Sequence, residues 1–196
     1  MPTAPALVHV LHLEAEVAAP IEVGRLPSGL RRVVPITGGT VSGLFTGRVL
    51  PGGADLQLIR TDTETEVEAR YLLESDDGEL VAVHNVGLRT GSAEDIARLR
   101  RDEPVDPARI YFRSTPRFET ASPRLAQLTT HVFVGTGTRQ PTSVTFDFFQ
   151  VSSNRLSHTR PPARAWASAR SSTGRTHISS VSSACSGSSP TRAVRR

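Results

Sequence analysis

The sequence predicts an all-β domain, a closed antiparallel β-barrel with one short helix, on three observations. Many short segments alternate apolar and polar residues with a period of two, the spacing of a strand with one buried face. Turn-forming residues separate these segments. Hydrophobic residues make up only 37% of the 196 residues and aromatic residues 5%, so we expect part of the chain to lie outside the core.

The clearest strand spans residues 66–74, where Val67, Ala69, Tyr71 and Leu73 alternate with charged residues. Similar but weaker patterns predict further strands. They span residues 6–17, 40–50, 54–60, 79–86, 109–114, 130–135 and 143–151. Many short strands of this kind are typical of a sandwich or a barrel.

Glycines mark several predicted turns. Asp77-Gly78 lies between two alternating segments and is a strong hairpin signal. We also interpret Pro51-Gly52-Gly53 and Gly135-Thr136-Gly137 as turns. Gly43 and Gly47 share one face of the 40–50 strand, which indicates either simple curvature, the reading we favour, or a wall kept clear for a ligand.

One helix is predicted at residues 93–101. Ser92 followed by Asp95 resembles a capping box, and Ile96 and Leu99 form a short apolar stripe. Pro104 follows shortly afterwards and favours an end to the helix.

The apolar patterning ends at Val151, which predicts a barrel domain over residues 1–151 and a disordered, Ser/Arg-rich tail over 152–196. All 19 acidic residues lie in the domain with 15 of the 23 arginines, whereas the other eight arginines lie in the tail. The domain therefore carries a formal charge of −4 and the tail +8. The basic balance of the whole chain is thus no reason to expect nucleic acid as a partner of the folded part.

The composition of the tail resembles an out-of-frame reading of GC-rich DNA, so we favour a frameshift or mis-spliced end over an evolved extension. A nucleic-acid-binding tail is the alternative, but this stretch has neither lysine nor interleaved aromatic residues.

Cysteine content and hydropathy predict a cytoplasmic protein. Cys185 is the only cysteine, so no internal disulfide can form. The N-terminus lacks a cationic region, and Glu14 and Glu16 interrupt its apolar stretch, unlike a signal peptide. No uncharged run approaches the ~20 residues of a membrane helix, so we expect no membrane partner.

Several ordered motifs run through the domain. They are Val23-Gly24, 32–39 (RVVPITGG), 47–55 (GRVLPGGAD), 68–71 (EARY), 85–87 (NVG), 111–113 (YFR), 116–120 (PRFET), 133–135 (FVG), Gly137 and Arg139. Through these motifs, residues 7–151 resemble the domain of unknown function 3237 family, also known as uncharacterised protein family 0311.

The resemblance implies a closed antiparallel barrel with a central cavity and supplies no established activity. Leu56 stands where the family usually has an aromatic residue, and Thr129 where asparagine is common. We therefore do not carry over a relative's ligand. Because the family normally ends near Val151, the resemblance also marks the tail as foreign.

The sequence predicts no metal site, no cofactor and no nucleophile elbow. His9 and His12 are three residues apart, which on a regular strand places them on opposite faces. No Gly-x-Ser-x-Gly or phosphate-binding loop is present.

With those sites excluded, the chemistry that the sequence still allows is acid–base catalysis or ligand binding by side chains inside the barrel. Asp55, His84 and Glu119 are the candidate catalytic acids or bases, and Tyr71, Asn85 and Arg113 the candidate ligand-binding residues. His84 and Asn85 are adjacent, so only one of them can point inward, and periodicity does not decide which. For Arg113 and Glu119 we favour a structural ion pair over a functional one, and we assign Arg32, Arg48, Arg89 and Arg139 to rims and surfaces.

Three functions fit this pattern. We favour a cofactor-independent isomerase, dehydratase or cyclase, of the kind found in secondary metabolism, that acts on a mainly apolar carbonyl compound. The alternative is a non-catalytic binding protein for an apolar small molecule. The third is an oligomeric scaffold with a filled barrel, and a homo-oligomer is compatible with all three.

Overall fold

The computed structural model describes residues 4–153, and these residues form ten strands, two α-helices and two 3₁₀ turns. The strands are β1 (Ala6–Val17), β2 (Ile21–Leu26), β3 (Gly29–Gly43), β4 (Gly47–Val49), β5 (Gly53–Ile59), β6 (Glu64–Ser75), β7 (Leu80–Thr90), β8 (Tyr111–Thr120), β9 (Phe133–Arg139) and β10 (Ser143–Ser152). The helical segments are α1 (Ala93–Arg100), η1 (Pro107–Arg109), η2 (Pro123–Leu125) and α2 (Gln127–Thr130). The predicted tail lies outside the described residues except for Ser152, which ends β10, and Ser153.

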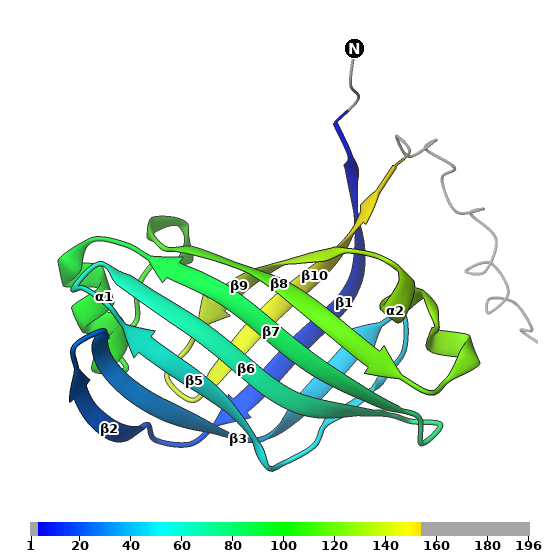
Figure 1. The fold of residues 1–196 in the computed structure, drawn as a ribbon, viewed down its shortest axis with the longest axis horizontal. Coiled ribbons are helices and arrows are strands. Elements are labelled where there is room, and N and C mark those ends of the chain that lie inside the picture. Colours follow the sequence, from blue (N-terminus) through cyan, green and yellow to red (C-terminus); the bar gives the residue numbers. More distant parts are fainter. Residues whose placement is uncertain (1–3, 154–196) are drawn as a thin grey trace, which may run out of the picture. The chain divides into compact units, whose positions relative to one another are not determined.

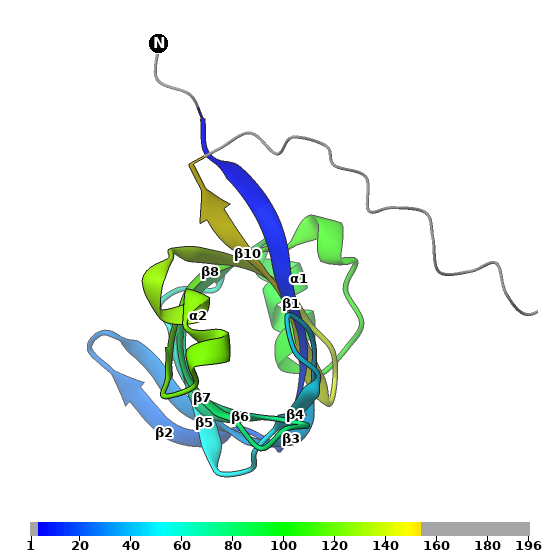
Figure 2. The ribbon, with the colours of Figure 1, turned by 90° about the vertical axis from the view of Figure 1, so that its right-hand side faces the viewer.

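The strands close into an eight-stranded antiparallel barrel (Figures 1 and 2). The order runs from β1 through β10, β9, β8, β7 and β6 to β3, and β3 pairs with β1 to close the ring. β4 and β5 share one place in the wall, because both pair with β3 on one side and β6 on the other. β2 pairs with β3 and extends the sheet beyond the ring.

Side chains alternate between the interior and the outer face along each wall strand. β8 shows this most clearly, with Phe112, Ser114, Pro116 and Phe118 buried and their neighbours at 111, 113, 115, 117 and 119 exposed. This alternation confirms the predicted period-two pattern.

The end of the barrel nearest α2 is filled with apolar side chains. Phe118 contacts Phe133 and Phe148 edge-on, at ring-centroid distances of 5.1 and 5.7 Å. Leu125 and Leu128, from η2 and α2, are fully buried in the same cluster. The short α2 was not predicted, since four residues carry too little periodicity to reveal a helix.

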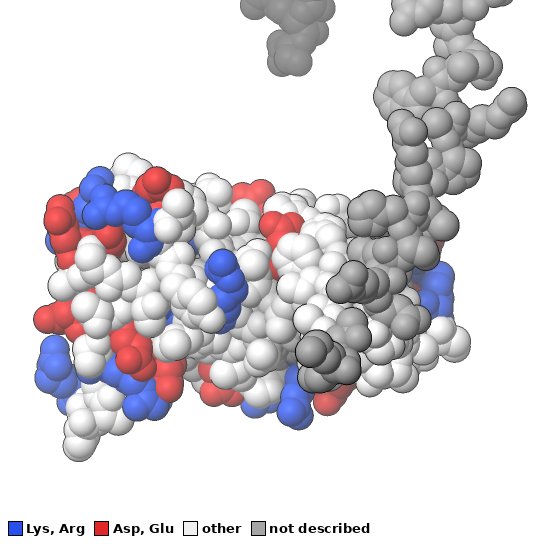
Figure 3. Space-filling view, turned by 90° about the horizontal axis from the view of Figure 1, so that it is seen from above, with Lys and Arg blue, Asp and Glu red and all other residues white. Residues whose placement is uncertain are grey.

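The opposite end carries α1, which confirms the predicted helix. The Ser92 side chain accepts a hydrogen bond from the Asp95 backbone N–H, and Ile96 and Leu99 are buried. Charged side chains gather around this end in Figure 3, whereas the middle of that face is largely uncharged.

Two predictions that involve glycines were wrong: the turn at Gly135-Thr136-Gly137 and the unbroken strand over residues 40–50. Gly135 and Gly137 lie inside β9, where a Cβ on Gly137 would stand 2.7 Å from the Phe112 ring and one on Gly135 2.9 Å from the Phe148 ring. Their absent side chains make room for phenyl rings rather than a turn. The predicted 40–50 strand is also broken, because Gly43 has a φ of +119° and the wall resumes only at Gly47.

The hairpin at Asp77-Gly78 is confirmed, with Gly78 at a φ of +81° between β6 and β7. Within residues 4–153, no helix is long and apolar enough to cross a membrane.

Candidate functional site

The α1 half of the barrel interior contains a chain of hydrogen-bonded polar side chains. Arg32 on β3 donates from Nε to Gln57 Oε1 over 2.7 Å. Gln57 on β5 in turn donates from Nε2 to Asp55 Oδ2 over 2.5 Å. The other oxygen of Asp55 accepts the Glu68 backbone N–H at 3.1 Å. Period-two spacing brings Asp55 and Gln57 to the same face, and strand pairing places Arg32 opposite Gln57.

Burial raises the pKa of the Asp55 carboxyl above its usual range. The hydrogen bonds from Gln57 and Glu68 and the charges of Arg89 and Arg32 oppose this shift without cancelling it. A carboxyl group with a raised pKa is a better match for proton transfer near neutral pH than an ordinary aspartate.

Arg89 on β7 is the most deeply buried arginine of the cluster, with a relative exposure of 2%. Burial and the neighbouring charges of Arg32 and Arg139 lower the pKa of Arg89 to about 10, although Asp55 acts in the opposite direction. Its guanidinium carbon lies 5.6 Å from the centroid of the Phe112 ring. Its Nε–H has no hydrogen-bond partner among the described residues.

Arg139 at the end of β9 connects the interior to the rim. It donates to the Gln140 and Ser143 carbonyl oxygens and pairs with Asp102 at 3.1 Å, just after α1. The Arg139 side chain is only 9% exposed. α1 and its following turn therefore bound the polar end of the interior.

Tyr71 and Asn85 stand beside Asp55 on the next two strands. Asp55 pairs with Ala69 on β6, and Ala69 pairs with Asn85 on β7, so the small Ala69 side chain separates two polar ones. Tyr71 follows Ala69 on the same interior face, and burial together with the Asp55 charge raises the pKa of its phenol. The Tyr71 hydroxyl and Asn85 Oδ1 are buried without a hydrogen-bond partner in the described part of the chain.

A cavity lies among these groups. Its volume is about 30 Å³, counted as the space open to the centre of a water molecule, which corresponds to about two waters. Polar lining comes from Asp55, Gln57, Tyr71, Asn85 and Arg139. Apolar lining comes from β1, β3, β6, β8 and β10, at Leu13, Ala15, Val17, Val34, Ile36, Val67, Ala69, Phe112, Val144 and Phe146.

The structure thus brings three of the six predicted site residues together in the interior and places the other three on the outer face, where His84 and Glu119 line a separate hollow of about 500 Å³. Asp55, Tyr71 and Asn85 line the cavity. Asn85, not its neighbour His84, takes the inward position, and His84 Nε2 lies 3.0 Å from Glu68 Oε1 on the outer face.

Glu119 and Arg113 both belong to the exposed face of β8. They stand six residues apart on that strand, and Arg113 donates to the Phe112 carbonyl oxygen and lies over the Tyr111 ring. Within the described residues, Arg113 and Glu119 form neither the structural ion pair that we favoured nor a functional one, although both side chains follow the outward phase of the strand.

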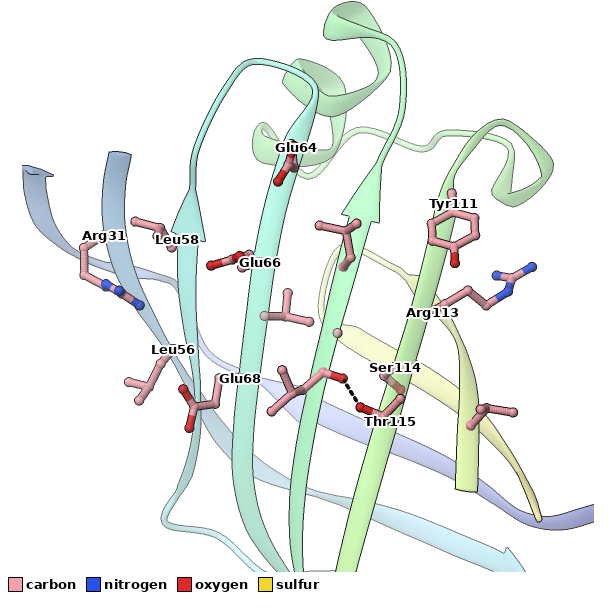
Figure 4. A pocket seen from close by; sticks show the side chains of 15 residues that line it. Arg31, Leu56, Leu58, Glu64, Glu66, Glu68, Tyr111, Arg113, Ser114 and Thr115 are labelled. Carbon is pink, nitrogen blue, oxygen red and sulfur yellow. Dashed lines mark hydrogen bonds between the residues drawn. The ribbon is translucent and has the colours of Figure 1, made fainter. Parts of the chain in front are cut away.

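A much larger hollow, of about 830 Å³, lies on this outer face and not in the interior. Figure 4 shows Arg31, Glu66, Glu68 and Tyr111 around it, spread over β3, β6 and β8. The hollow is a broad, open depression whose charged side chains reach solvent. The buried groups with perturbed pKa values instead surround the small interior cavity, so we place the candidate site there.

The histidines near the N-terminus correct another expectation. A bulge between His9 and Leu11 buries both Val10 and Leu11 and returns His9 and His12 to the same outer face. Their ring nitrogens lie 3.0 and 2.9 Å from the same oxygen of Asp147. Within residues 4–153, no group of three or more metal-ligating side chains is arranged to hold an ion.

Sequence reasoning missed the arginines at 32, 89 and 139, which belong to the interior rather than to the surface. Arg89 is in phase with Val81, Val83 and Asn85, and extending that alternation by four residues identifies it. The sequence therefore did contain a signal for this residue, namely an arginine at a position that the alternation of the strand directs inward.

The fold and the site define a closed β-barrel protein with a buried polar cluster at one end of its interior. The chain belongs to the family described as protein of unknown function (DUF3237), whose model matches residues 5–151. It is 44% identical over 144 residues to a UPF0311 protein of Rhodopseudomonas palustris, covering 73% of this chain and 94% of that protein.

Solved structures share the fold. The crystal structure of a conserved protein of unknown function from Rhodopseudomonas palustris superimposes with a TM-score of 0.73 at 43% identity, covering 77% of this chain and 99% of that one. An enzyme from Penicillium herquei superimposes with a TM-score of 0.58 at 18% identity, covering 78% of this chain and 98% of that one. At that identity the second match shows a shared fold only.

Proposed function

We propose that the protein is a cofactor-independent enzyme that transfers a proton next to the carbonyl group of a small, mainly apolar metabolite inside the barrel. Isomerisation, dehydration and cyclisation of such compounds share this step. The observation that carries the proposal is the half-buried Asp55 carboxyl, which lines a cavity alongside Tyr71, whose hydroxyl has no hydrogen-bond partner among the described residues.

Asp55 is positioned to act as the base. Two of its lone-pair sites accept hydrogen bonds from Gln57 and Glu68, and a carboxylate has about four such sites. The remaining sites can take a proton from the carbon beside the carbonyl group and return it at a second position. The raised pKa of Asp55 favours this exchange.

Tyr71 and Asn85 are positioned to bind the carbonyl oxygen. The Tyr71 hydroxyl and the Asn85 amide can each donate a hydrogen bond, and negative charge develops on that oxygen as the proton leaves. Tyr71 itself stays protonated, since its phenol pKa is raised. His84, Glu119 and Arg113 face outward and take no part in a site inside the barrel.

A non-catalytic binding protein is the second candidate. The apolar majority of the cavity lining favours it, since an apolar ligand needs only one polar contact to fix its orientation. The two candidates differ in whether a bound carbonyl compound exchanges protons.

Native mass spectrometry of the full-length protein purified from its host identifies compounds that co-purify. Proton NMR in D₂O then follows exchange beside the carbonyl group for these compounds and for a panel of cyclic ketones and enones. We expect the wild type to accelerate exchange and Asp55→Asn to slow it by about 10²–10⁴-fold, whereas Asp62→Asn, at an exposed turn, leaves the rate unchanged. Binding without any exchange that depends on Asp55 would favour the carrier.

A further inference from the structure

The polar end of the interior holds more positive than negative charge. Three guanidinium groups, those of Arg32, Arg89 and Arg139, are close enough for their charges to act on one another. The carboxylates that act on them are Asp55, within the interior, and Asp102, at the rim. Arg32 is also influenced by Glu22 and by a fourth cation, Arg100, whose opposite charges leave the balance of the cluster unchanged. With Asp55 ionised the cluster is therefore left with one positive charge, and with Asp55 protonated with two.

Of the three arginines, Arg89 is the one whose positive charge has no adjacent partner in the described part of the chain. Arg139 is paired with Asp102, and Arg32 donates to Gln57. Among residues 4–153, no carboxylate oxygen lies within 4.0 Å of a nitrogen of Arg89, whose Nε–H also lacks a hydrogen-bond partner. Asp55 acts on Arg89 through its charge but makes no hydrogen bond to it, and the hydrogen bonds that Asp55 accepts come from Gln57 and Glu68.

An unpaired guanidinium at 2% exposure is expensive to hold in a folded protein. Within the described residues, Asp55 and the Phe112 ring attract the Arg89 guanidinium, whereas Arg32 and Arg139 repel it and its Nε–H makes no hydrogen bond. Phe112 lies against the guanidinium and lines the cavity. Arg89 is not itself among the residues that line the cavity, so a ligand there reaches the Arg89 edge only by extending past the Phe112 ring, which it also contacts.

We propose that Arg89 binds the carboxylate of the ligand, so that the protein acts on small carboxylic acids. This inference extends the proposed function and depends on it only for the reaction that follows binding. The carboxylate binds at Arg89, and the reacting carbonyl group lies toward Asp55 and Tyr71. A carboxylate matches the fork of a guanidinium with two parallel hydrogen bonds. The apolar part of the acid lies among Phe112, Val67 and Phe146.

The test compares each carboxylate with its neutral amide: acetate with acetamide, and benzoate with benzamide. ¹H–¹⁵N NMR of the arginine Nε–H groups of the full-length protein follows binding at the guanidinium itself, and titration gives the dissociation constants. We expect the carboxylates to bind at least about tenfold more tightly than the amides, equal to about 1.4 kcal/mol, and to shift the Arg89 Nε–H signal. Arg89→Met removes this preference, and Arg89→Lys retains part of it.

Arg117→Met is the matched control, because Arg117 is an arginine on the exposed face of β8, and it retains the full preference. Equal binding of carboxylate and amide by the wild type, or an unchanged preference in Arg89→Met, overturns the inference. Asp55→Asn separates this result from the proposed function: we expect it to bind acetate at least as tightly as the wild type while losing proton exchange. Carboxylate binding with no exchange in any variant supports the anion site and counts against the enzyme.

Discussion

Gln57 donates to Asp55 through Nε2 and accepts from Arg32 through Oε1. These two contacts fix which group donates and which accepts along the hydrogen-bonded series from Arg32 to Asp55. Arginine can only donate, so the Gln57 oxygen has to face Arg32. The Gln57 amide nitrogen then has to face residue 55, which requires an acceptor at that position. The hydrogen bond from Gln57 therefore favours the ionised form of Asp55, and it is burial that raises the pKa of this carboxyl against that contact.

Asp55→Asn should change how the free energy of unfolding depends on pH. Because the folded pKa of Asp55 lies above the unfolded value, the folded state binds more protons between the two values, and wild-type stability falls as pH rises through that window. The substituted amide has one acceptor oxygen for two donors, so at low pH we expect the variant to be less stable by about 1 kcal/mol. The two stability curves then converge or cross toward neutral pH.

Urea titrations from pH 3 to pH 8 measure this difference. Asp62→Asn, at an exposed turn, is the control and should run parallel to the wild type. A constant offset between Asp55→Asn and wild type across the whole range would show that burial does not raise the pKa of Asp55.

Tyr71→Phe should stabilise the protein while impairing its chemistry. The Tyr71 hydroxyl is buried without a partner among the described residues, and leaving such a group unsatisfied costs about 1–3 kcal/mol. Phenylalanine keeps the ring and removes this cost, so we expect a higher melting temperature by calorimetry together with slower proton exchange. Tyr111→Phe is the matched control, because Tyr111 is 54% exposed, and it should change neither property. A less stable Tyr71→Phe variant would mean that the hydroxyl contributes to folding.

Much of the barrel could be predicted because its wall strands keep a strict alternation, as in 66–74. The prediction failed where local geometry departs from that rule. The bulge beside His9 shifts the phase by one residue, and Gly43 breaks a strand that the pattern shows as continuous. Neither departure changes the local composition, so neither is visible in hydrophobic periodicity.

The site was predicted only in part, for a related reason. Tyr71 was identified from its strand phase. Asp55 was chosen as a carboxylate, and Asn85 was left as an alternative to His84 that the phase did not decide, whereas Arg89 was assigned to the surface from its residue type. Arginine is rarely buried without a partner, so residue type argues against the position that the strand phase requires. Such a conflict between type and phase is expected at functional sites.

Gly137→Ala should destabilise the barrel, because a Cβ at this position would stand 2.7 Å from Phe112 and 2.8 Å from Phe146. Both rings line the cavity, so overpacking by one methyl group should cost about 1–3 kcal/mol and reduce ligand binding. Gly38→Ala is the control, since the nearest atom to its Cβ would be Glu16 Oε2 at 3.5 Å, an ordinary contact. Urea denaturation compares the two variants. Equal stability would show that the two rings move aside freely.

Glu79→Gln should remove an acid-sensitive component of stability. Hydrogen bonds from Arg124 and Ser122 lower the pKa of Glu79 to about 2. A folded pKa below the unfolded value of 4.5 gives stability that is present above the unfolded value and is lost as pH falls toward 2. The sign is opposite to that of Asp55, whose raised pKa adds stability as pH falls.

Melting temperatures from pH 2 to pH 6 check this prediction. We expect the wild type to lose stability relative to Glu79→Gln below pH 4.5, so that the difference between them shrinks with acidification. Glu14→Gln, on the exposed face of β1, should track the wild type. The double variant with Asp55→Asn should show the sum of the two pH profiles, because the residues lie toward opposite ends of the barrel and share no partner. A non-additive profile would mean that the two ends of the barrel are coupled in acid.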